Sequence, residues 1–71
     1  MKIYINMQGG ICQGVSTDDA KLVGAEYVVI DYDTEGADEA DITTVEQEHG
    51  DIADALIGGG TIDRLTVKIK A

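Results

Sequence analysis

The distribution of charge constrains this chain more than any other feature of its sequence. Twelve acidic side chains and no Lys or Arg lie between Val23 and Asp63, in a chain of 71 residues with a formal net charge of -9. Like charges at this density repel one another and oppose compaction. Solubility alone requires less charge. The acidity therefore predicts a partner that favours negative charge, either a cation or a protein surface built to hold nucleic acid.

The length and composition predict one small acidic domain that spans residues 1–71. A chain of this size buries only about 60% of its unfolded surface, so its stability margin is small. Hydrophobic residues make up 44% of the sequence, which is enough for a core and argues against general disorder. Because Trp, Phe and Pro are absent, the core must consist of Ile, Val, Leu, Met and Tyr.

The sequence lacks the signals of membrane insertion and secretion. No apolar stretch approaches the roughly 20 residues of a membrane span, and the N-terminus has no basic-plus-apolar signal region. The single Cys12 excludes an internal disulfide framework. We therefore expect a cytoplasmic protein that does not associate with membranes.

The N-terminal segment predicts a β-hairpin. Lys2 to Gln8 alternates apolar and polar residues with the period of a strand. Gly9-Gly10 suits a tight two-residue turn into a second strand from Ile11 to Ser16. The predicted register pairs Met7 with Cys12, Ile5 with Gly14 and Ile3 with Ser16. Cys12 would then share the apolar core face and be buried as a small hydrophobe.

The middle of the chain predicts two further strands. Thr17-Asp18-Asp19 is a polar break with capping chemistry, and Ala20 to Val23 is compatible with one helical turn. Glu26 to Asp33 is the strongest strand of the chain. Thr34 to Asp41 predicts an acidic loop or a single turn. Ile42 to Gln47 is compatible with a strand, because Thr43, Thr44 and Val45 are β-branched.

The C-terminal third predicts a short helix and a last strand. Asp51 is a plausible N-cap for a helix through Ala55 and Leu56, with a strand through Ala55-Leu56-Ile57 as the alternative. Gly58-Gly59-Gly60 then reads as a flexible connection. Apolar residues alternate in the last strand, at Leu65, Val67 and Ile69. The predicted fold is α+β, a small antiparallel β-sheet of four to five strands with one short helix packed on it.

Alternation in the central strand predicts a row of carboxylates. Asp31, Asp33 and Glu35 would project from one side, about 6.6 Å apart at the usual rise of a strand. One DNA strand carries a charge about every 3.4 Å, which is a comparable linear density. The partner-binding residues predicted on this basis are Asp31, Asp33, Glu35, Asp38, Glu39, Asp41, Glu46 and Glu48.

This acidic surface predicts a nucleic-acid-binding protein with a Lys/Arg-rich groove as the partner. Direct binding of nucleic acid by the chain itself is disfavoured by its charge. Charge runs are usually solvated faces of soluble proteins. The absence of interleaved Lys or Arg favours the binding function, because an ordinary charged surface mixes both signs.

A calcium site competes for the same residues. Asp31-x-Asp33-x-Glu35-Gly36 matches the opening of an EF-hand loop. Position twelve of that loop should be a bidentate Glu and is Ile42, and the preceding residues predict a strand instead of a helix. No metal is therefore predicted, and a calcium-binding protein is kept only as an alternative.

Catalytic chemistry has little support in the sequence. Cys12, His49 and several carboxylates are the residue types of a nucleophile, a base and an orienting group, but no local motif connects them. The Gly58-Gly59-Gly60 run lacks the Lys and Ser/Thr of a phosphate loop. We predict a protein without enzymatic activity and without a cofactor.

Two stretches of the sequence resemble a known group of proteins. They read G-G-I-C-Q-G-V-S-T-D-D from Gly9 to Asp19 and V-V-I-D-Y-D-T-E-G-A-D-E from Val28 to Glu39. Together with the N-terminal strand they resemble a family of very small, largely uncharacterised proteins of phages, plasmids and bacterial genomes. The D-Y-D-T-E-G-A-D string is the most specific part, and the resemblance ends before Ile42. The family carries no activity over to individual residues.

The size, the acidity and this mobile-element origin are also similar in kind to anti-CRISPR proteins, several of which act as DNA mimics. That similarity implies an inhibitor in the bacterial host cytoplasm that blocks target-DNA binding by a CRISPR effector complex through its acidic face. The alternative, besides calcium binding, is a small acidic interaction module that is not an inhibitor. An exposed edge strand in so small a sheet leaves both a monomer and a weak dimer open.

Overall fold

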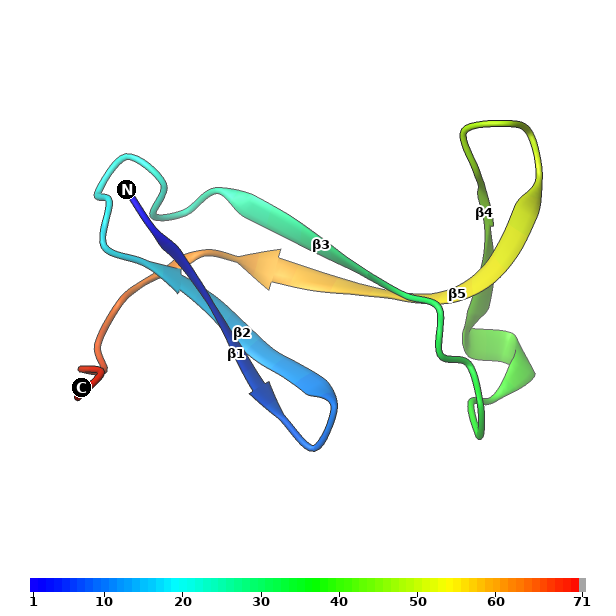
Figure 1. Ribbon diagram of the computed structural model, residues 1–71, viewed down its shortest axis with the longest axis horizontal. Helices are drawn as coiled ribbons and strands as arrows, with labels where there is room; N and C mark the ends of the chain where they lie inside the picture. Colours follow the sequence, from blue (N-terminus) through cyan, green and yellow to red (C-terminus); the bar gives the residue numbers. More distant parts are fainter. Residues whose placement is uncertain (71) are drawn as a thin grey trace. The chain divides into compact units, whose positions relative to one another are not determined.

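The computed structural model describes residues 1–70, and its regular secondary structure consists of β-strands and one 3-10 turn (Figure 1). The elements in chain order are β1 (Ile3–Gln8), β2 (Ile11–Thr17), β3 (Glu26–Asp31), the 3-10 turn η1 (Glu39–Asp41), β4 (Ile42–Glu46), β5 (Ile52–Thr61) and β6 (Asp63–Arg64). They form two three-stranded sheets, with strand orders β1-β2-β6 and β3-β5-β4. The predicted β-structure is confirmed as mostly antiparallel, but it forms two small sheets instead of one sheet of four to five strands. The predicted helix packed on the sheet is wrong, because residues 1–70 contain no α-helix.

Contacts within the chain define two compact units. The first, called here the hairpin unit, comprises Met1–Tyr27 and Gly59–Ala71, and the second, the acidic unit, comprises Val28–Gly58. Strands β3 and β5 each contribute residues to both units. Each unit therefore draws on strands that are distant in the sequence.

The β1–β2 hairpin turns at the predicted glycines. Gly9 and Gly10 have φ values of 59° and 77°, and positive φ at both central residues is the property of the two-residue turn that matches strand twist. Met7 lies opposite Cys12 as predicted. A register shift then places Ile5 opposite Val15 and Ile3 opposite Thr17. The predicted pairs with Gly14 and Ser16 are wrong, because a β-bulge adds one residue to β2 and moves every later pair by one.

The buried residues of the hairpin unit belong to β2 and to the segment that precedes β6. Val15, Ser16 and Thr17 are buried, as is Ile62. Thr17 is fully buried, and its hydroxyl donates to the Lys2 carbonyl at 2.7 Å and accepts from the Asp19 N–H at 3.1 Å. These bonds compensate the polar group for its loss of water.

The apolar side chains of β1 are not buried as predicted. Ile3, Ile5 and Met7 retain 53%, 65% and 59% of their exposure. Cys12 is half-buried and not fully buried, and its thiol donates to the Gly14 carbonyl at 3.7 Å. Alternation alone predicts which side chains share a face, but burial requires another element to cover that face.

The segment between β2 and β3 contains turns and no helix. The Asp19 carbonyl accepts from the Leu22 N–H at 3.0 Å, and the Leu22 carbonyl accepts from the Ala25 N–H at 3.1 Å. Two bonds of 2.8 Å then join this segment to Ile62, whose carbonyl accepts from Gly24 and whose N–H donates to Ala25. The polar break is confirmed, and it leads into a pair of turns.

Strand β5 replaces both the predicted helix and the predicted flexible connection. It runs from Ile52 through the three glycines to Thr61, so the strand alternative through Ala55-Leu56-Ile57 is confirmed. Its antiparallel partner β4 aligns Ile42 with Leu56 and Glu46 with Ile52. Pairing with a β-branched neighbour outweighs the weak local preference for a helix.

The predicted C-terminal strand is wrong. Residues 65–70 lie outside any strand, and β6 contains only Asp63 and Arg64. β6 runs parallel to the end of β2, with Arg64 opposite Thr17, and the Leu65 N–H donates to the Thr17 carbonyl at 2.9 Å. Because β2 ends at Thr17, the alternating residues that follow find no strand to pair with.

Candidate acidic interface

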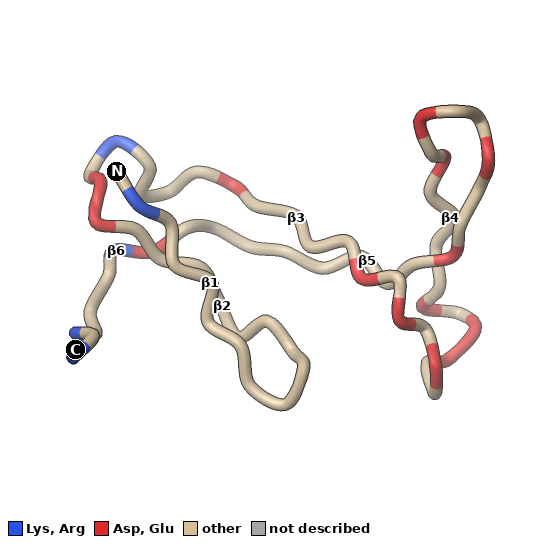
Figure 2. The backbone as a smooth tube through the Cα atoms, in the orientation of Figure 1, with Lys and Arg blue, Asp and Glu red and all other residues tan. Residues whose placement is uncertain are grey.

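Charge is distributed unequally between the two units (Figure 2). The acidic unit contains ten carboxylates and no Lys or Arg, whereas the hairpin unit contains all five basic residues and four acidic ones. All ten carboxylates of the acidic unit are exposed. The net negative charge of the chain thus resides in residues 28–58, and that unit has no Lys or Arg to neutralise it.

The predicted row of carboxylates along one strand is not formed. β3 ends at Asp31, so Asp33 and Glu35 lie beyond the strand. The Asp33 N–H donates to Asp31 Oδ1 at 3.0 Å, and the Glu35 N–H donates to Asp33 Oδ1 at 3.3 Å. Asp31 and Asp33 each form a local turn, in which the side chain accepts the backbone N–H two residues further along the chain. These side chains compete with a neighbouring strand for the backbone donors, which is why the alternation does not continue as a strand.

Asp38 also binds the backbone. It is the N-cap of η1, and its Oδ1 accepts from the Ala40 N–H at 3.1 Å. By contrast, the described residues donate no hydrogen bond to the side chains of Glu35, Glu39 and Asp41. The six predicted residues of this loop therefore divide into three that shape the loop and three whose carboxylates are available to a partner.

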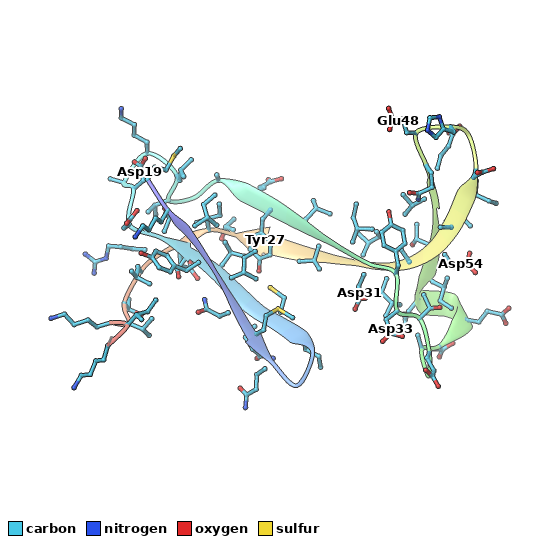
Figure 3. All side chains as sticks on the ribbon, in the orientation of Figure 1. Asp19, Tyr27, Asp31, Asp33, Glu48 and Asp54 are labelled. Carbon is cyan, nitrogen blue, oxygen red and sulfur yellow. The ribbon has the colours of Figure 1, made fainter. Side chains whose placement is uncertain are left out.

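A side-chain contact links the two predicted acidic clusters. Gln47 Nε2 donates to Tyr32 Oη at 3.3 Å and to the Val45 carbonyl at 3.2 Å. Asp31 and Asp33 flank Tyr32 in the sequence (Figure 3), as Glu46 and Glu48 flank Gln47. The structure thereby connects segments that the sequence treats separately. No sequence signal marks Tyr32 or Gln47, because their contact depends on how β3 and β4 are brought together through β5.

The turn between β4 and β5 carries Glu48. The Gln47 N–H donates to the Asp51 carbonyl at 2.6 Å, and the Gly50 N–H donates to the Gln47 carbonyl at 3.0 Å. Gly50 has a φ of 88°, which favours glycine. Glu48 and its neighbour His49 are both exposed in this turn. The turn therefore presents a carboxylate on a backbone that is closed by its own hydrogen bonds.

Metal binding receives no support from the geometry. Within residues 1–70, no group of three or more His, Cys, Asp or Glu side chains is placed to hold a metal ion. Asp31 and Asp33, the first two expected calcium ligands, each accept a backbone N–H. Ile42, at the twelfth position of the loop, begins β4. The described residues therefore offer no assembled set of oxygen ligands of the kind that calcium requires.

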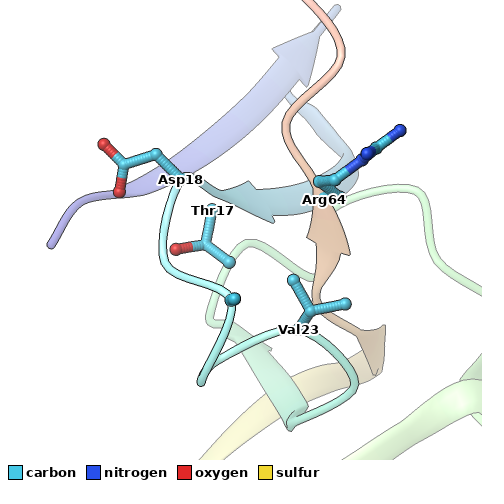
Figure 4. A pocket seen from close by; sticks show the side chains of 5 residues that line it. Thr17, Asp18, Val23 and Arg64 are labelled. Atoms are coloured by element: carbon cyan, nitrogen blue, oxygen red, sulfur yellow. The ribbon is translucent and has the colours of Figure 1, made fainter.

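A hollow of about 330 Å³ lies in the hairpin unit (Figure 4). Its wall is formed by Thr17, Asp18, Ala20, Val23 and Arg64. The Thr17 hydroxyl is already bonded, and Asp18 Oδ1 accepts from the Lys2 N–H at 3.0 Å. The side chains of Asp18 and Arg64 point to opposite sides (Figure 4). Small-molecule sites have convergent polar groups, so this hollow is not a candidate site.

Comparison with known proteins gave no match to a family model, to a curated protein or to a solved structure. The resemblance to small phage and plasmid proteins accordingly stays a prediction. In the part of the chain that the structure describes, no helix has the length and apolar character required to cross a membrane.

Proposed function

We propose that this protein is a non-enzymatic inhibitor that mimics DNA, encoded by a phage or another mobile element. Its most specific form is an anti-CRISPR protein that occupies the DNA-binding groove of a CRISPR effector complex in the bacterial cytoplasm. The observation that carries the proposal is the acidic unit, in which ten exposed carboxylates stand without any Lys or Arg.

The physical basis is competition for a basic groove. A groove that binds DNA gains affinity by exchanging counterions for Lys/Arg–phosphate contacts. Exposed carboxylates at high density offer the same exchange. Long-range attraction chiefly raises the association rate, while close and desolvated pairs determine how long the complex lasts. The acidic unit has no Lys or Arg that could pair with these carboxylates and reduce this attraction.

The predicted site residues have different parts in this mechanism. Within residues 1–70 no backbone N–H donates to the carboxylates of Glu35, Glu39 and Asp41, and we assign them to direct pairing with Lys or Arg of the target. Glu46 ends β4 and Glu48 lies in the turn that follows it, and we assign both to supporting contacts. Asp31, Asp33 and Asp38 contribute charge and also hold the shape of the loop. A loop of defined shape loses less entropy on binding than a mobile acidic tail.

The first test is phage plaquing on CRISPR-immune hosts, one host for each system type, each expressing this protein. We expect plaquing to be restored in the host whose system is inhibited. The purified effector complex of that system should then lose target-DNA binding as the protein is added. Failure to rescue plaquing in every host would overturn the anti-CRISPR assignment.

The second test is a charge reversal with a matched control. Glu35→Lys with Glu39→Lys alters two available carboxylates of the acidic unit, whereas Glu26→Lys with Asp63→Lys makes the same charge change in the hairpin unit. We expect the first pair to abolish inhibition and the second to retain it. Reversal of Asp31 and Asp33 should also abolish inhibition, but it removes two backbone bonds as well. Equal inhibition by both folded variants would contradict the mimic mechanism.

The affinity for the target should also fall steeply with ionic strength. Counterion exchange makes the logarithm of the binding constant fall linearly with the logarithm of salt concentration. Titration at several salt concentrations measures this slope. An affinity that does not change with salt would show that apolar contacts, and not the carboxylates, hold the complex.

A further inference from the structure

The β1–β2 hairpin contains no charged residue. Residues 3–17 include no Asp, Glu, Lys, Arg or His, in a chain in which 27% of residues are charged. Lys2 and Asp18 lie directly at the two ends of this stretch, and the hairpin between them is free of acidic and basic positions (Figure 2). The stretch is therefore a surface on which two copies of this acidic chain can approach without opposing like charges.

Strand β1 forms an unprotected edge of its sheet. Among the described residues it pairs, in the strand order β1-β2-β6, only with β2, so the backbone N–H and C=O groups of every second residue along its six-residue length face outward on the other side. Natural edge strands are usually protected by a charged residue, a Pro or a covering element. β1 has neither a charge nor a Pro. Its outer edge is thus open to pairing with another strand.

The apolar side chains of this edge are exposed next to a buried neighbour. Val15 and Thr17 are 7% and 0% exposed, whereas their direct partners Ile5 and Ile3 are 65% and 53% exposed. The residues that bury Val15 and Thr17 on β2 therefore do not extend over Ile5 and Ile3 on β1. A strand added beside β1 would continue the sheet and bring apolar side chains against this uncovered edge.

The hairpin unit is also close to the lower size limit for independent stability. It comprises about 40 residues, and units below this size usually require a disulfide, a metal or oligomerisation. The chain has a single Cys, so no internal disulfide forms, and residues 1–70 contain no metal-binding cluster. Pairing with a second copy would bury further surface of this unit and so add to its stability.

We propose that β1 is a homodimerisation edge that pairs antiparallel with β1 of a second copy. Antiparallel pairing of a strand with itself is isologous, so it closes at two chains and leaves no further edge of the same kind. With Ile5 of the two copies opposite each other, Ile3 of one copy lies opposite Met7 of the other, and all of these side chains share one face. The two three-stranded sheets that contain β1 become one sheet, and the dimer presents two acidic units. This proposal is independent of what the acidic unit binds.

The test is the mass of the full chain in solution, measured by light scattering over a roughly hundredfold dilution series. Ile5→Lys places a charge on the edge, and Ile69→Lys makes the same change at a residue that is 75% exposed outside any strand. We expect the wild type and Ile69→Lys to be dimers that dissociate on dilution, and Ile5→Lys to be monomeric. A monomeric wild type at every concentration, or a dimer that Ile5→Lys leaves intact, would overturn the proposal.

Hydrogen exchange of the wild type provides a second measurement that does not depend on a variant folding. We expect amides in residues 3–8 to lose protection when the protein is diluted, while amides of β4 and β5 keep theirs. Equal protection of β1 at all concentrations would contradict the dimer. Flotation of a monomeric wild type with neutral phosphatidylcholine vesicles would instead assign the hairpin to a lipid surface, and would equally overturn the proposal.

Discussion

Thr17 has no exposed surface, although its side chain is polar. The hydroxyl joins the chain before β1 to the turn after β2, because it donates to the Lys2 carbonyl and accepts from the Asp19 N–H. The Thr17 carbonyl accepts from the N–H of Leu65, the residue directly after β6. One residue thus connects three segments of the hairpin unit. A pattern of apolar residues gives no reason to single it out.

Replacing the Thr17 hydroxyl should destabilise the protein. Thr17→Val keeps the shape of the side chain but leaves the Lys2 carbonyl and the Asp19 N–H without their partner. We expect the free energy of unfolding to fall by about 1–3 kcal/mol, measured by chemical denaturation. Thr43→Val, at an exposed position of β4, makes the same chemical change and should alter it by less than about 0.5 kcal/mol. Equal stability of the two variants would mean that the Thr17 bonds contribute nothing.

At the scale of elements, β5 shows how packing can require a glycine. A Cβ atom built on Gly60 would lie 3.2 Å from Tyr27 Oη and 3.4 Å from Tyr27 Cε1. A Cβ on Gly58 would meet no atom within 4 Å. The run of glycines is therefore not a uniform connection. Gly60 allows the Tyr27 ring to lie against the backbone of β5, and Gly58 makes no such contact.

The two glycines should respond differently to the same substitution. Gly58→Ala fills open space and restricts the unfolded chain, so we expect a gain of about 0.4–1 kcal/mol in the free energy of unfolding. Gly60→Ala crowds the Tyr27 ring, and we expect a loss of about 1 kcal/mol. Thermal denaturation of both variants measures the difference. In a Tyr27→Phe background the cost of Gly60→Ala should shrink, and an unchanged cost would show that the Tyr27 hydroxyl is not the obstacle.

The β1–β2 hairpin shows which features a local sequence pattern predicts and which it does not. The turn at Gly9-Gly10 and the pair Met7–Cys12 follow from the sequence, because both depend only on adjacent residues. The sequence does not predict the β-bulge, which shifts the register between Asn6 and Met7. Its extra residue changes the partners of Ile5 and Ile3. Apolar alternation in β1 is the same with or without the bulge, so it cannot reveal the shift.

At the scale of the whole molecule, the charge distribution determines the response to ionic strength. All ten carboxylates of the acidic unit are exposed, and none has a Lys or Arg of that unit beside it. Repulsion among them disfavours the folded state, in which they are held close together. Screening by salt weakens repulsion between exposed charges, because the Debye length falls from about 30 Å at 0.01 M to about 8 Å at 0.15 M.

Salt should therefore stabilise this protein. Between about 0.01 M and about 0.15 M NaCl we expect the melting temperature to rise by roughly 4–8 °C, which corresponds to about 1 kcal/mol for a domain of this size. Circular dichroism at a fixed chain concentration measures the shift. A variant with Glu35→Gln, Glu39→Gln and Asp41→Asn carries less charge and should gain less. A melting temperature that stays constant or falls with salt would contradict repulsion among the carboxylates.

The candidate interface was predictable in its composition but not in its form. Counting charges along the chain already identifies residues 28–58 as acidic, and every predicted partner-binding residue is exposed. The expected row on one strand is replaced by turns at Asp31 and Asp33 and by a cap at Asp38. Strand alternation assumes that the backbone donors are used by a neighbouring strand. In this loop the side chains of Asp31, Asp33 and Asp38 accept hydrogen bonds from backbone N–H groups instead.

The sequence by itself determined the features that depend on neighbouring residues. These are the glycine turn of the hairpin, strands β3 and β4, the polar break after Thr17 and the acidity of the central segment. Only the tertiary structure decided which segments pair and which are covered. Pairing with β4 makes residues 52–61 a strand, and the end of β2 at Thr17 leaves residues 65–70 unpaired despite their alternation. A strand is stable only beside another strand, and that neighbour is not encoded within the segment itself.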